Sequence, residues 1–312
     1  MSAEPCLSQV EHLAEQLAAV PDAEVRMREP LARYTSFGVG GPADVLVMPG
    51  SAKALQQVMR IVCDTGARPL VLGNGTNLIV RDGGMRGVVV LTARGLTGLT
   101  VQGTDIITES GRALASLCCT CAQRGLAGME FAAGIPGTLG GALIMNAGAN
   151  GGEIGSVTRW VEVVEPDGSV TRYEPEQLQF GYRESALKGL DGAVLRACLG
   201  LAPGDPDQVH DALCEAMALR CARQPVALAS AGSIFKRPEG DYAGRLLEEA
   251  GAKGMCVGGA AVSEKHANFI VNRGGATARD VLSLIEALRQ LVYDRSGVML
   301  EPEVCVVGED AA

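Results

Sequence analysis

The sequence lacks the features that mark several large classes of protein. No apolar run approaches the ~20 residues that a membrane-spanning helix needs, and the first residues, MSAEPCLSQVEHLAEQ, show no basic region followed by an apolar core. Basic stretches are also missing, and 27 Lys and Arg stand against 36 Asp and Glu, for a net charge of −9. We therefore expect a cytosolic chain that binds small molecules, inserts into no membrane and binds no nucleic acid.

Internal repeats of solenoid length and low-complexity tracts are absent too, which favours ordinary globular domains. The 312 residues exceed the usual size of one domain. The composition changes to that of a loop at LAPGDPDQV. This change predicts a first domain over residues 1–205, a second over 206–298, and a C-terminal strand over 299–312 that returns to the active site.

Hydrophobic periodicity predicts an α+β fold for both domains. The sequence WVEVVEPDGSVTRY, with a PDG turn between two alternating segments, is typical of a β-hairpin. Helices are expected over residues 8–19, 53–63, 207–220, 243–250 and 278–293. Strands are expected over residues 45–48, 69–73, 87–92, 105–109, 193–201, NFIVN and EVCVVG.

The two commonest nucleotide-binding fingerprints are missing. The Rossmann pattern GxGxxG fails after Gly73 and Gly75, because Leu78 stands where the third glycine is required. There is no Walker lysine either. A glycine-rich cofactor site in this chain must therefore use another scaffold.

Glycine, by contrast, is abundant, with 41 residues in 312, nearly twice the typical share of about 7%. The glycines cluster in short loops, and one of these is VLGNGTNLIV at residues 71–80. Backbone N–H groups and neutral polar side chains in such a turn suit a pyrophosphate. The candidate cofactor-binding residues of this loop are Gly73, Asn74, Gly75, Thr76 and Asn77.

A second glycine-rich segment, GIPGTLGGALIMNAG, begins at residue 134 and suits a flat ring system. Proline stiffens its first turn, glycines remove side chains, and an asparagine offers an amide. Its candidate cofactor-binding residues are Gly134, Ile135, Pro136, Gly137, Thr138, Gly140, Gly141 and Asn146. A single glycine loop is more often only a tight turn, but two polar glycine loops together favour a ligand.

The ten cysteines, in a chain without a secretory signal, are most simply reduced thiols. Cys118 and Cys121 match the spacing CxxC, which occurs in zinc sites. They share one helical stripe with Leu114 and Leu117, and a second metal-binding pair is missing. Packing in the core is therefore favoured over zinc binding, and no metal site is predicted.

Eight segments in family order make the chain similar to the UDP-N-acetylenolpyruvoylglucosamine reductase (MurB) family of peptidoglycan precursor synthesis. Single motifs such as GIPG are weak signals, whereas the whole set spans nearly the entire chain. The segments are YTSFGVGGPAD (34–44), VLGNGTNLIV, GMEFAAGIPGTLGGA, FGYRES (180–185), QPVALASAGSIFKRP (224–238), AGAKG (250–254), VSEKHANFIVN (262–272) and LEPEV (300–304).

The resemblance implies a FAD-binding domain of the p-cresol methylhydroxylase and vanillyl-alcohol oxidase type, followed by an α+β substrate domain. The FAD-binding domain would consist of two subdomains, about residues 1–66 and 67–205. The implied reaction is reduction of UDP-N-acetylglucosamine enolpyruvate to UDP-N-acetylmuramate, with NADPH as reductant of a non-covalent FAD. Because the hairpin runs directly into GYRES, the chain resembles the shorter of the family's two subtypes.

The resemblance also implies three catalytic residues. Arg183 matches the arginine that stabilises the substrate carboxylate, and Ser233 matches the donor of a proton to the carbon beside it. Glu303 matches the catalytic glutamate, although Glu301 lies on the same face of a regular strand and periodicity cannot distinguish the two. From local sequence alone, a surface ion pair, a turn serine and a solvated edge charge are the more ordinary interpretations of the three.

The matching segments imply weaker candidates for substrate binding, because a diphosphate needs cations or backbone donors. They are Tyr182, Lys236, Arg237, Lys265, His266 and Asn268, with Lys253 near them. A histidine such as His266, at the start of an apolar strand, is more often a structural hydrogen-bonding group than a catalyst.

Two other functions stay open at this point. A flavin-dependent oxidase of the same fold would often tether its flavin covalently through His or Tyr, but His12, His210 and His266 all lie outside the glycine loops. A non-catalytic nucleotide-sugar binding protein is the least economical alternative, because all three catalytic positions are retained. The oligomeric state is left open.

Overall fold

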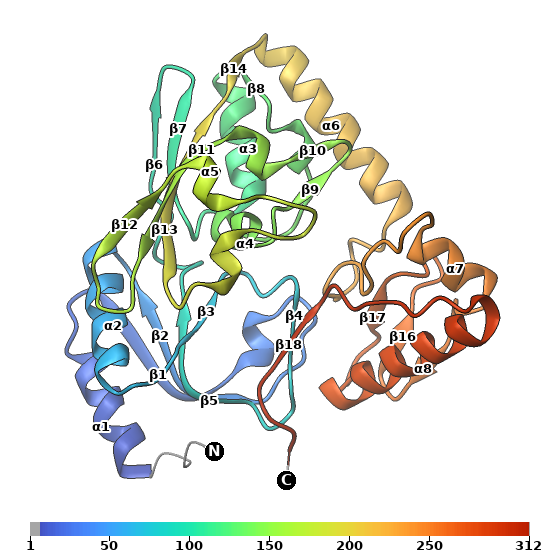
Figure 1. Cartoon of the computed structure of the whole chain (residues 1–312), viewed down its shortest axis with the longest axis horizontal. Coiled ribbons are helices and arrows are strands. Elements are labelled where there is room, and N and C mark those ends of the chain that lie inside the picture. Colours follow the sequence, from blue (N-terminus) through green and yellow to red (C-terminus); the bar gives the residue numbers. More distant parts are fainter. Residues whose placement is uncertain (1–6, 312) are drawn as a thin grey trace. The chain divides into compact units, whose positions relative to one another are not determined.

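The computed structural model describes residues 7–311 and separates into two compact units, each built from several stretches of chain (Figure 1). Unit 1 consists of Met1–Arg28, Asp44–Asn74 and Gly87–Ala218, and unit 2 of Glu29–Ala43, Gly75–Arg86 and Leu219–Ala312. The sequence predicts contiguous domains instead, and those boundaries stay a prediction.

The N-terminal part of unit 1 contains a four-stranded sheet and two helices that share one apolar cluster. The strand order is β1-β2-β5-β3, and β3 runs parallel to β5. In α2, Leu55, Val58, Met59 and Val62 form one buried stripe, and the side chain of Ser51 caps the helix by accepting the N–H of Ala54. The elements are α1 (Leu7–Ala18), β1 (Ala23–Pro30), β2 (Pro42–Pro49), α2 (Ala52–Asp64), β3 (Leu70–Leu72) and β5 (Met85–Leu91).

The rest of unit 1 centres on a five-stranded antiparallel sheet, in the order β12-β11-β13-β7-β6 (Figure 1). At the PDG turn, the N–H of Gly168 bonds to the carbonyl of Glu165, and glycine is needed there because its φ is +83°. The strands are β6 (Leu99–Gln102), β7 (Asp105–Glu109), β11 (Thr158–Val164), β12 (Val170–Tyr173) and β13 (Ala193–Gly200).

Short elements complete unit 1. The helices are α3 (Leu114–Gln123), α4 (Leu139–Ile144) and α5 (Pro175–Leu178), with 3-10 turns at Glu130–Ala132, Ile154–Val157 and Ala186–Gly189. The strand pairs are β8 (Leu126–Ala127) with β14 (Ala202–Pro203), and β9 (Gly148–Ala149) with β10 (Gly152–Glu153).

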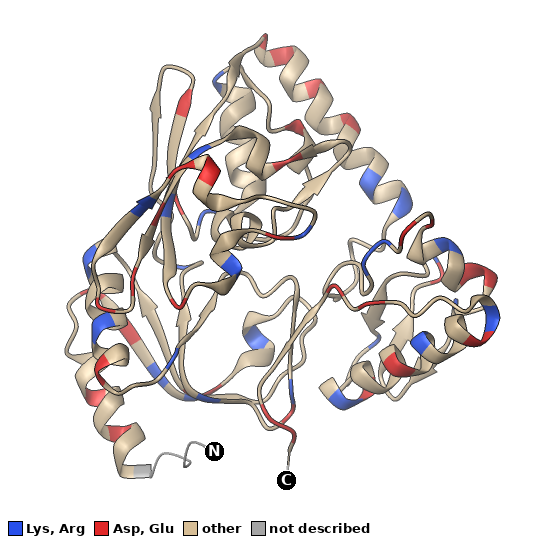
Figure 2. Ribbon diagram, viewed as in Figure 1, with Lys and Arg blue, Asp and Glu red and all other residues tan. Residues whose placement is uncertain are grey.

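The long helix α6 (Pro206–Arg223) begins in unit 1 and ends in unit 2. Its acidic residues lie toward its beginning, and Arg220 and Arg223 lie in its last turn (Figure 2). This charge order stabilises the helix, because acidic groups favour the positive N-terminal end of the helix dipole and basic groups the C-terminal end.

Unit 2 is a small α+β core. The antiparallel sheet β15-β16-β17 packs with α7 and α8, and β18 pairs in parallel with β4. The carboxylate of Asp82 accepts the N–H groups of Ala278 and Arg279 at 2.8 and 2.9 Å, so it anchors segment 75–86 to the start of α8. The elements are a 3-10 turn at Leu31–Tyr34, β4 (Leu78–Val80), α7 (Ala243–Glu249), β15 (Cys256–Val257), β16 (Ala260–Val262), β17 (Ile270–Asn272), α8 (Ala278–Ser296) and β18 (Cys305–Val307).

The helices, the strands and the hairpin predicted from periodicity are confirmed, with ends displaced by a few residues. Several strands escaped prediction, and the longest of them are β1 and β6, which are largely polar and show no apolar run. The second glycine-rich segment also contains helix α4, whose first turn holds Gly140 and Gly141. Contacts with other residues of the same chain, such as Ser110 beside Gly140, allow these glycines to be helical despite their low helix propensity.

The CxxC cysteines lie in the core of unit 1, as predicted. Cys118 and Cys121 are 3% and 1% exposed, and both belong to the apolar cluster around α3. Burial raises the pKa of each thiol to about 12. The two residues therefore act as small hydrophobic side chains.

This burial predicts selective thiol reactivity. At pH 8, a pKa of about 12 leaves only ~10⁻⁴ of a thiol as the reactive thiolate. Iodoacetamide should therefore leave Cys118 and Cys121 unmodified in the native protein while it modifies the exposed Cys119, as measured by peptide mass spectrometry. Denatured protein provides the control, since all three thiols should then react. Equal modification in the native state would contradict the buried assignment.

Candidate functional site

The two glycine-rich segments meet inside unit 1. A Cβ atom on Gly73 would lie 2.3 Å from Oγ1 of Thr138, so only glycine allows this approach. A third stretch borders the same place, because Leu139 N–H bonds to the carbonyl of Arg112 and Gly140 N–H bonds to that of Ser110, at 2.9 and 2.8 Å. Residues 110–112 were not predicted to take part.

Two buried hydroxyl groups at this junction have no hydrogen-bond partner among the described residues. Thr138 and Ser110 are each 1% exposed, and neither side-chain oxygen is bonded. A buried hydroxyl without a partner is costly, and such an atom often marks the place of a bound ligand. The junction therefore fits an oxygen-rich group such as the diphosphate of FAD. Ser110 lies in no motif, so no sequence signal identifies it as a functional residue.

The other predicted cofactor residues of unit 1 shape the backbone. Gly134 and Gly137 have φ values of +72° and +132°, which side chains rarely adopt. Asn146 is 1% exposed, accepts the N–H of Gly155 at 3.0 Å and donates to the carbonyl of Gly181 at 2.9 Å. Its amide thus supports the chain, and its contact with a cofactor stays a prediction.

The remaining part of the first glycine loop lies in unit 2. A Cβ atom on Gly75 would lie 2.4 Å from the carbonyl oxygen of Tyr34, and the N–H of Ser36 bonds to the carbonyl of Gly75. Asn77 donates from Nδ2 to the carbonyl of Glu303 at 3.3 Å. The end of this loop is therefore tied directly to the segment that carries the predicted catalytic glutamate.

Arg183 sits on a tight turn in unit 1. Gly181 and Glu184 exchange both backbone hydrogen bonds, and Arg183 between them has a φ of +59°. A left-handed arginine is uncommon and costs conformational energy, and Arg28 adopts the same conformation with a φ of +50°. The guanidinium lies 5.2 Å from the ring centroid of Tyr182, which is 58% exposed. Asn146 holds this turn through Gly181.

Ser233 and Glu303 lie on two paired segments of unit 2. Glu303 N–H bonds to the carbonyl of Ile234 at 2.7 Å, and Lys236 N–H bonds to that of Glu301 at 2.9 Å. The pairing is antiparallel, and both Ser233 and Glu303 are partly buried. Ser233, the predicted proton donor, is therefore the residue directly before Ile234, whose carbonyl accepts the N–H of Glu303.

The predicted substrate residue Asn268 is held inside unit 2. It is 6% exposed, and its amide forms two hydrogen bonds of 2.9 Å with the backbone of Phe235. Nδ1 of His266 accepts the N–H of Asn268 at 3.1 Å, so this ring nitrogen carries no proton. Burial lowers the pKa of His266, and the nearby Lys253 acts in the same direction, which favours the neutral ring.

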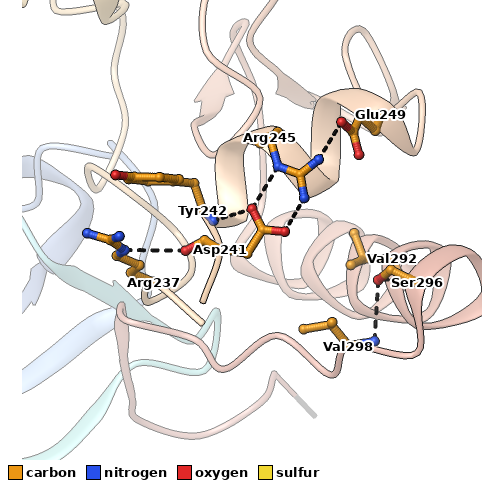
Figure 3. A network of polar contacts seen from close by, with 8 residues as sticks. All are labelled: Arg237, Asp241, Tyr242, Arg245, Glu249, Val292, Ser296 and Val298. Carbon is orange, nitrogen blue, oxygen red and sulfur yellow. Dashed lines mark hydrogen bonds and ion pairs between the residues drawn. The ribbon is translucent and has the colours of Figure 1, made fainter. Parts of the chain in front are cut away.

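The predicted cations of the substrate site already have protein partners. Lys236 pairs with Glu301 at 3.4 Å, and Lys265 bonds to the carbonyl of Cys221. The guanidinium of Arg237 stacks 4.1 Å from the ring centroid of Tyr242, and its Nε bonds to the carbonyl of Asp241 (Figure 3). Their contacts with a substrate stay predictions.

The same network fixes the start of α7. The carboxylate of Asp241 accepts hydrogen bonds from Arg245 and from the N–H of Tyr242 (Figure 3). The Arg245 guanidinium lowers the pKa of Asp241 to about 2. Because Asp241 stays ionised at neutral pH, the loop that carries Arg237 and Tyr242 is held in place.

A cavity of about 520 Å³ opens in unit 2 beside Lys265. Its wall also contains Arg273, Glu264, Ser263 and Gln224, together with apolar residues of the segment that follows α6. Because Lys265 and Arg273 are cationic and the rest of the wall is largely apolar, the cavity suits a ligand that has both an anionic and an apolar part.

The described part of the chain contains no group of three or more His, Cys, Asp and Glu side chains that could hold a metal ion. None of the helices that the structure describes combines the length and apolar character needed to cross a bilayer.

Comparison with known proteins gives the same family over nearly the whole chain. The family model "UDP-N-acetylenolpyruvoylglucosamine reductase, C-terminal domain" matches residues 224–307, and the model "FAD binding domain" matches residues 43–174. The UDP-N-acetylenolpyruvoylglucosamine reductase of Rubrobacter xylanophilus is 48% identical over 90% of this chain and 94% of its own length. That of Clostridioides difficile is 42% identical over 92% and 94%.

A solved structure of the corresponding reductase from Thermus caldophilus resembles the chain in three dimensions. The TM-score is 0.78 at 37% sequence identity, and the match covers 91% of this chain and 98% of that one. The α+β fold class with a FAD-binding domain is thereby confirmed.

Proposed function

The chain belongs to the UDP-N-acetylenolpyruvoylglucosamine reductase family, and from this we propose that it reduces UDP-N-acetylglucosamine enolpyruvate to UDP-N-acetylmuramate with NADPH. The observation that carries the proposal is the pairing of the Ser233 segment with the Glu303 segment inside unit 2. A donor and a carboxylate held on two paired segments suit protonation of a substrate carbon.

The FAD-binding residues are proposed to lie at the junction of the glycine-rich segments in unit 1. Gly73 makes room, while the unbonded hydroxyls of Thr138 and Ser110 can donate to phosphate oxygens. FAD, when bound, supplies hydride-transfer chemistry that no amino-acid side chain provides. The histidines lie outside this junction, which supports non-covalent binding.

The three catalytic residues are proposed to act on the enolpyruvyl group. Arg183 would pair with its carboxylate, which gains negative charge as hydride arrives, and a guanidinium suits this planar group. Ser233 would donate its hydroxyl proton to the carbon next to the carboxylate. Glu303 would form a hydrogen bond that supports this proton transfer.

The diphosphate of the substrate is proposed to bind cations of unit 2. Lys265 and Arg273 line the cavity there, and Lys236 and Arg237 follow the Ser233 segment directly. A water-soluble nucleotide sugar of this kind is made in the cytoplasm, where we also place this enzyme and its role in peptidoglycan precursor synthesis.

One experiment tests the function against the two alternatives. Purified protein should be yellow, lose its colour with NADPH under anaerobic conditions, and regain it when UDP-N-acetylglucosamine enolpyruvate is added. The product should gain two hydrogen atoms by mass spectrometry. UDP-N-acetylglucosamine, which lacks the double bond, serves as the control. Rapid recovery of colour in air alone would indicate an oxidase, and colourless protein would indicate a non-catalytic binder.

A further inference from the structure

We propose that Asn268 is a positioning residue for Ser233, which it holds in register with the segment that carries Glu303. The inference rests on the proposed function, because it assumes that Ser233 donates the proton. In this inference the Asn268 side chain acts by hydrogen-bonding the backbone beside Ser233, and not by binding the substrate.

The side-chain amide and the backbone carbonyl of Asn268 both bond to the residues that follow Ser233. Oδ1 accepts the N–H of Phe235 and Nδ2 donates to the carbonyl of Phe235, both at 2.9 Å. The backbone carbonyl of Asn268 accepts the N–H of Ile234 at 2.9 Å. Phe235 and Asn268 are both buried, so water cannot replace these bonds.

The other edge of the same segment is bound to residues 301–303, which precede β18. There, Ile234 accepts the N–H of Glu303 and Lys236 donates to the carbonyl of Glu301. An extended segment offers backbone groups to both edges, and no strand among the described residues covers the edge that faces Asn268. The asparagine amide donates one N–H and accepts through its oxygen there, and so takes the place of a neighbouring strand.

The position of Ser233 depends on the bonds on both sides of it in the chain. Before it, the hydroxyl of Ser36 donates to the carbonyl of Ser230 at 2.7 Å, and Gly232 has a φ of +78°. After it, the bonds of Asn268 hold Ile234 and Phe235. A serine hydroxyl is a weak acid and acts as a proton donor only when closely placed. His266 fixes Asn268 in turn, through its bond to the Asn268 N–H.

The test separates the two half-reactions in Asn268→Ala and in the isosteric Asn268→Asp, which keeps an acceptor but loses the donor. Stopped-flow absorbance measures flavin reduction by NADPH and flavin reoxidation by the enolpyruvyl nucleotide, in H₂O and in D₂O. Asn272→Ala is the matched control, because its amide also binds backbone groups of unit 2, at Phe37, Gly274 and Ala276.

Both Asn268 variants should be reduced by NADPH at close to the wild-type rate. Reoxidation should slow by about 10-fold to 10²-fold, with a larger solvent isotope effect, because a displaced donor makes proton transfer limiting. Asn272→Ala should show no such selective loss. Equal slowing of both half-reactions, loss of flavin from both variants, or a normal reoxidation rate would overturn the proposal. Failure of the wild-type enzyme to reoxidise would instead refute the proposed function.

Discussion

Ser233→Ala should keep its FAD and its reduction by NADPH, yet lose about 10²-fold to 10⁴-fold in reoxidation by the enolpyruvyl substrate. The physical reason is that the variant lacks the hydroxyl proton, while the backbone bonds that hold its segment remain, since they involve Ile234, Phe235 and Lys236. Single-turnover absorbance of the flavin measures both steps.

The control for this variant is Ser296→Ala. Ser296 lies in the same unit, where its hydroxyl donates to the carbonyl of Val292 within α8. The same hydroxyl accepts the N–H of Val298 (Figure 3). This variant should keep both half-reactions, and thermal unfolding of the two variants should differ little from that of the wild type. Undiminished reoxidation in Ser233→Ala would remove Ser233 from the mechanism and leave the proton to another group.

Arg183→Lys should lower kcat/KM for the enolpyruvyl nucleotide by about 10²-fold to 10³-fold, which is the usual cost of one lost charge-stabilising donor. Lysine keeps the positive charge but loses the planar fork that matches a carboxylate. Both residues pay the same conformational cost at a φ of +59°, so the free energy of unfolding should stay nearly unchanged. Steady-state kinetics and urea unfolding check the two parts.

Arg124→Lys provides the matched exchange at an exposed position of unit 1, at the end of α3, and should leave kcat/KM unaltered. In Arg183→Lys, flavin reduction by NADPH should also proceed normally, because the arginine is proposed to contact the carboxylate of the other substrate. If the two substitutions had the same small effect, Arg183 would be an ordinary surface residue held in an uncommon conformation.

Local patterns were sufficient for much of the fold. The stripe of Leu55, Val58, Met59 and Val62 predicts α2 because a 3.6-residue period buries one face of a helix. The PDG turn predicts the β11-β12 hairpin because Gly168 can adopt the positive φ that the turn needs. Polar strands such as β6 carry no comparable signal, since their pairing with neighbours fixes them.

The candidate site was predictable only in part. Motifs identified Gly73, Thr138, Ser233 and Glu303 as belonging to functional segments, but they could not show which segments pair. Ser110 was missed because a serine without a motif looks like any other. Asn268 is a candidate for substrate binding because its segment matches the family, and that contact stays a prediction. Only the structure shows that its amide bonds to the backbone of Phe235.

The sequence by itself determined the α+β class, the family and the segments that carry chemistry, because periodicity, turn residues and motifs are properties of neighbouring residues. Only the tertiary structure decided that Gly73 faces Thr138, that the segments of Ser233 and Glu303 lie in register, and that Asn268 closes their free edge. Those contacts join residues far apart in the chain. Their geometry follows from the packing of whole elements and from the need to pair every buried backbone group.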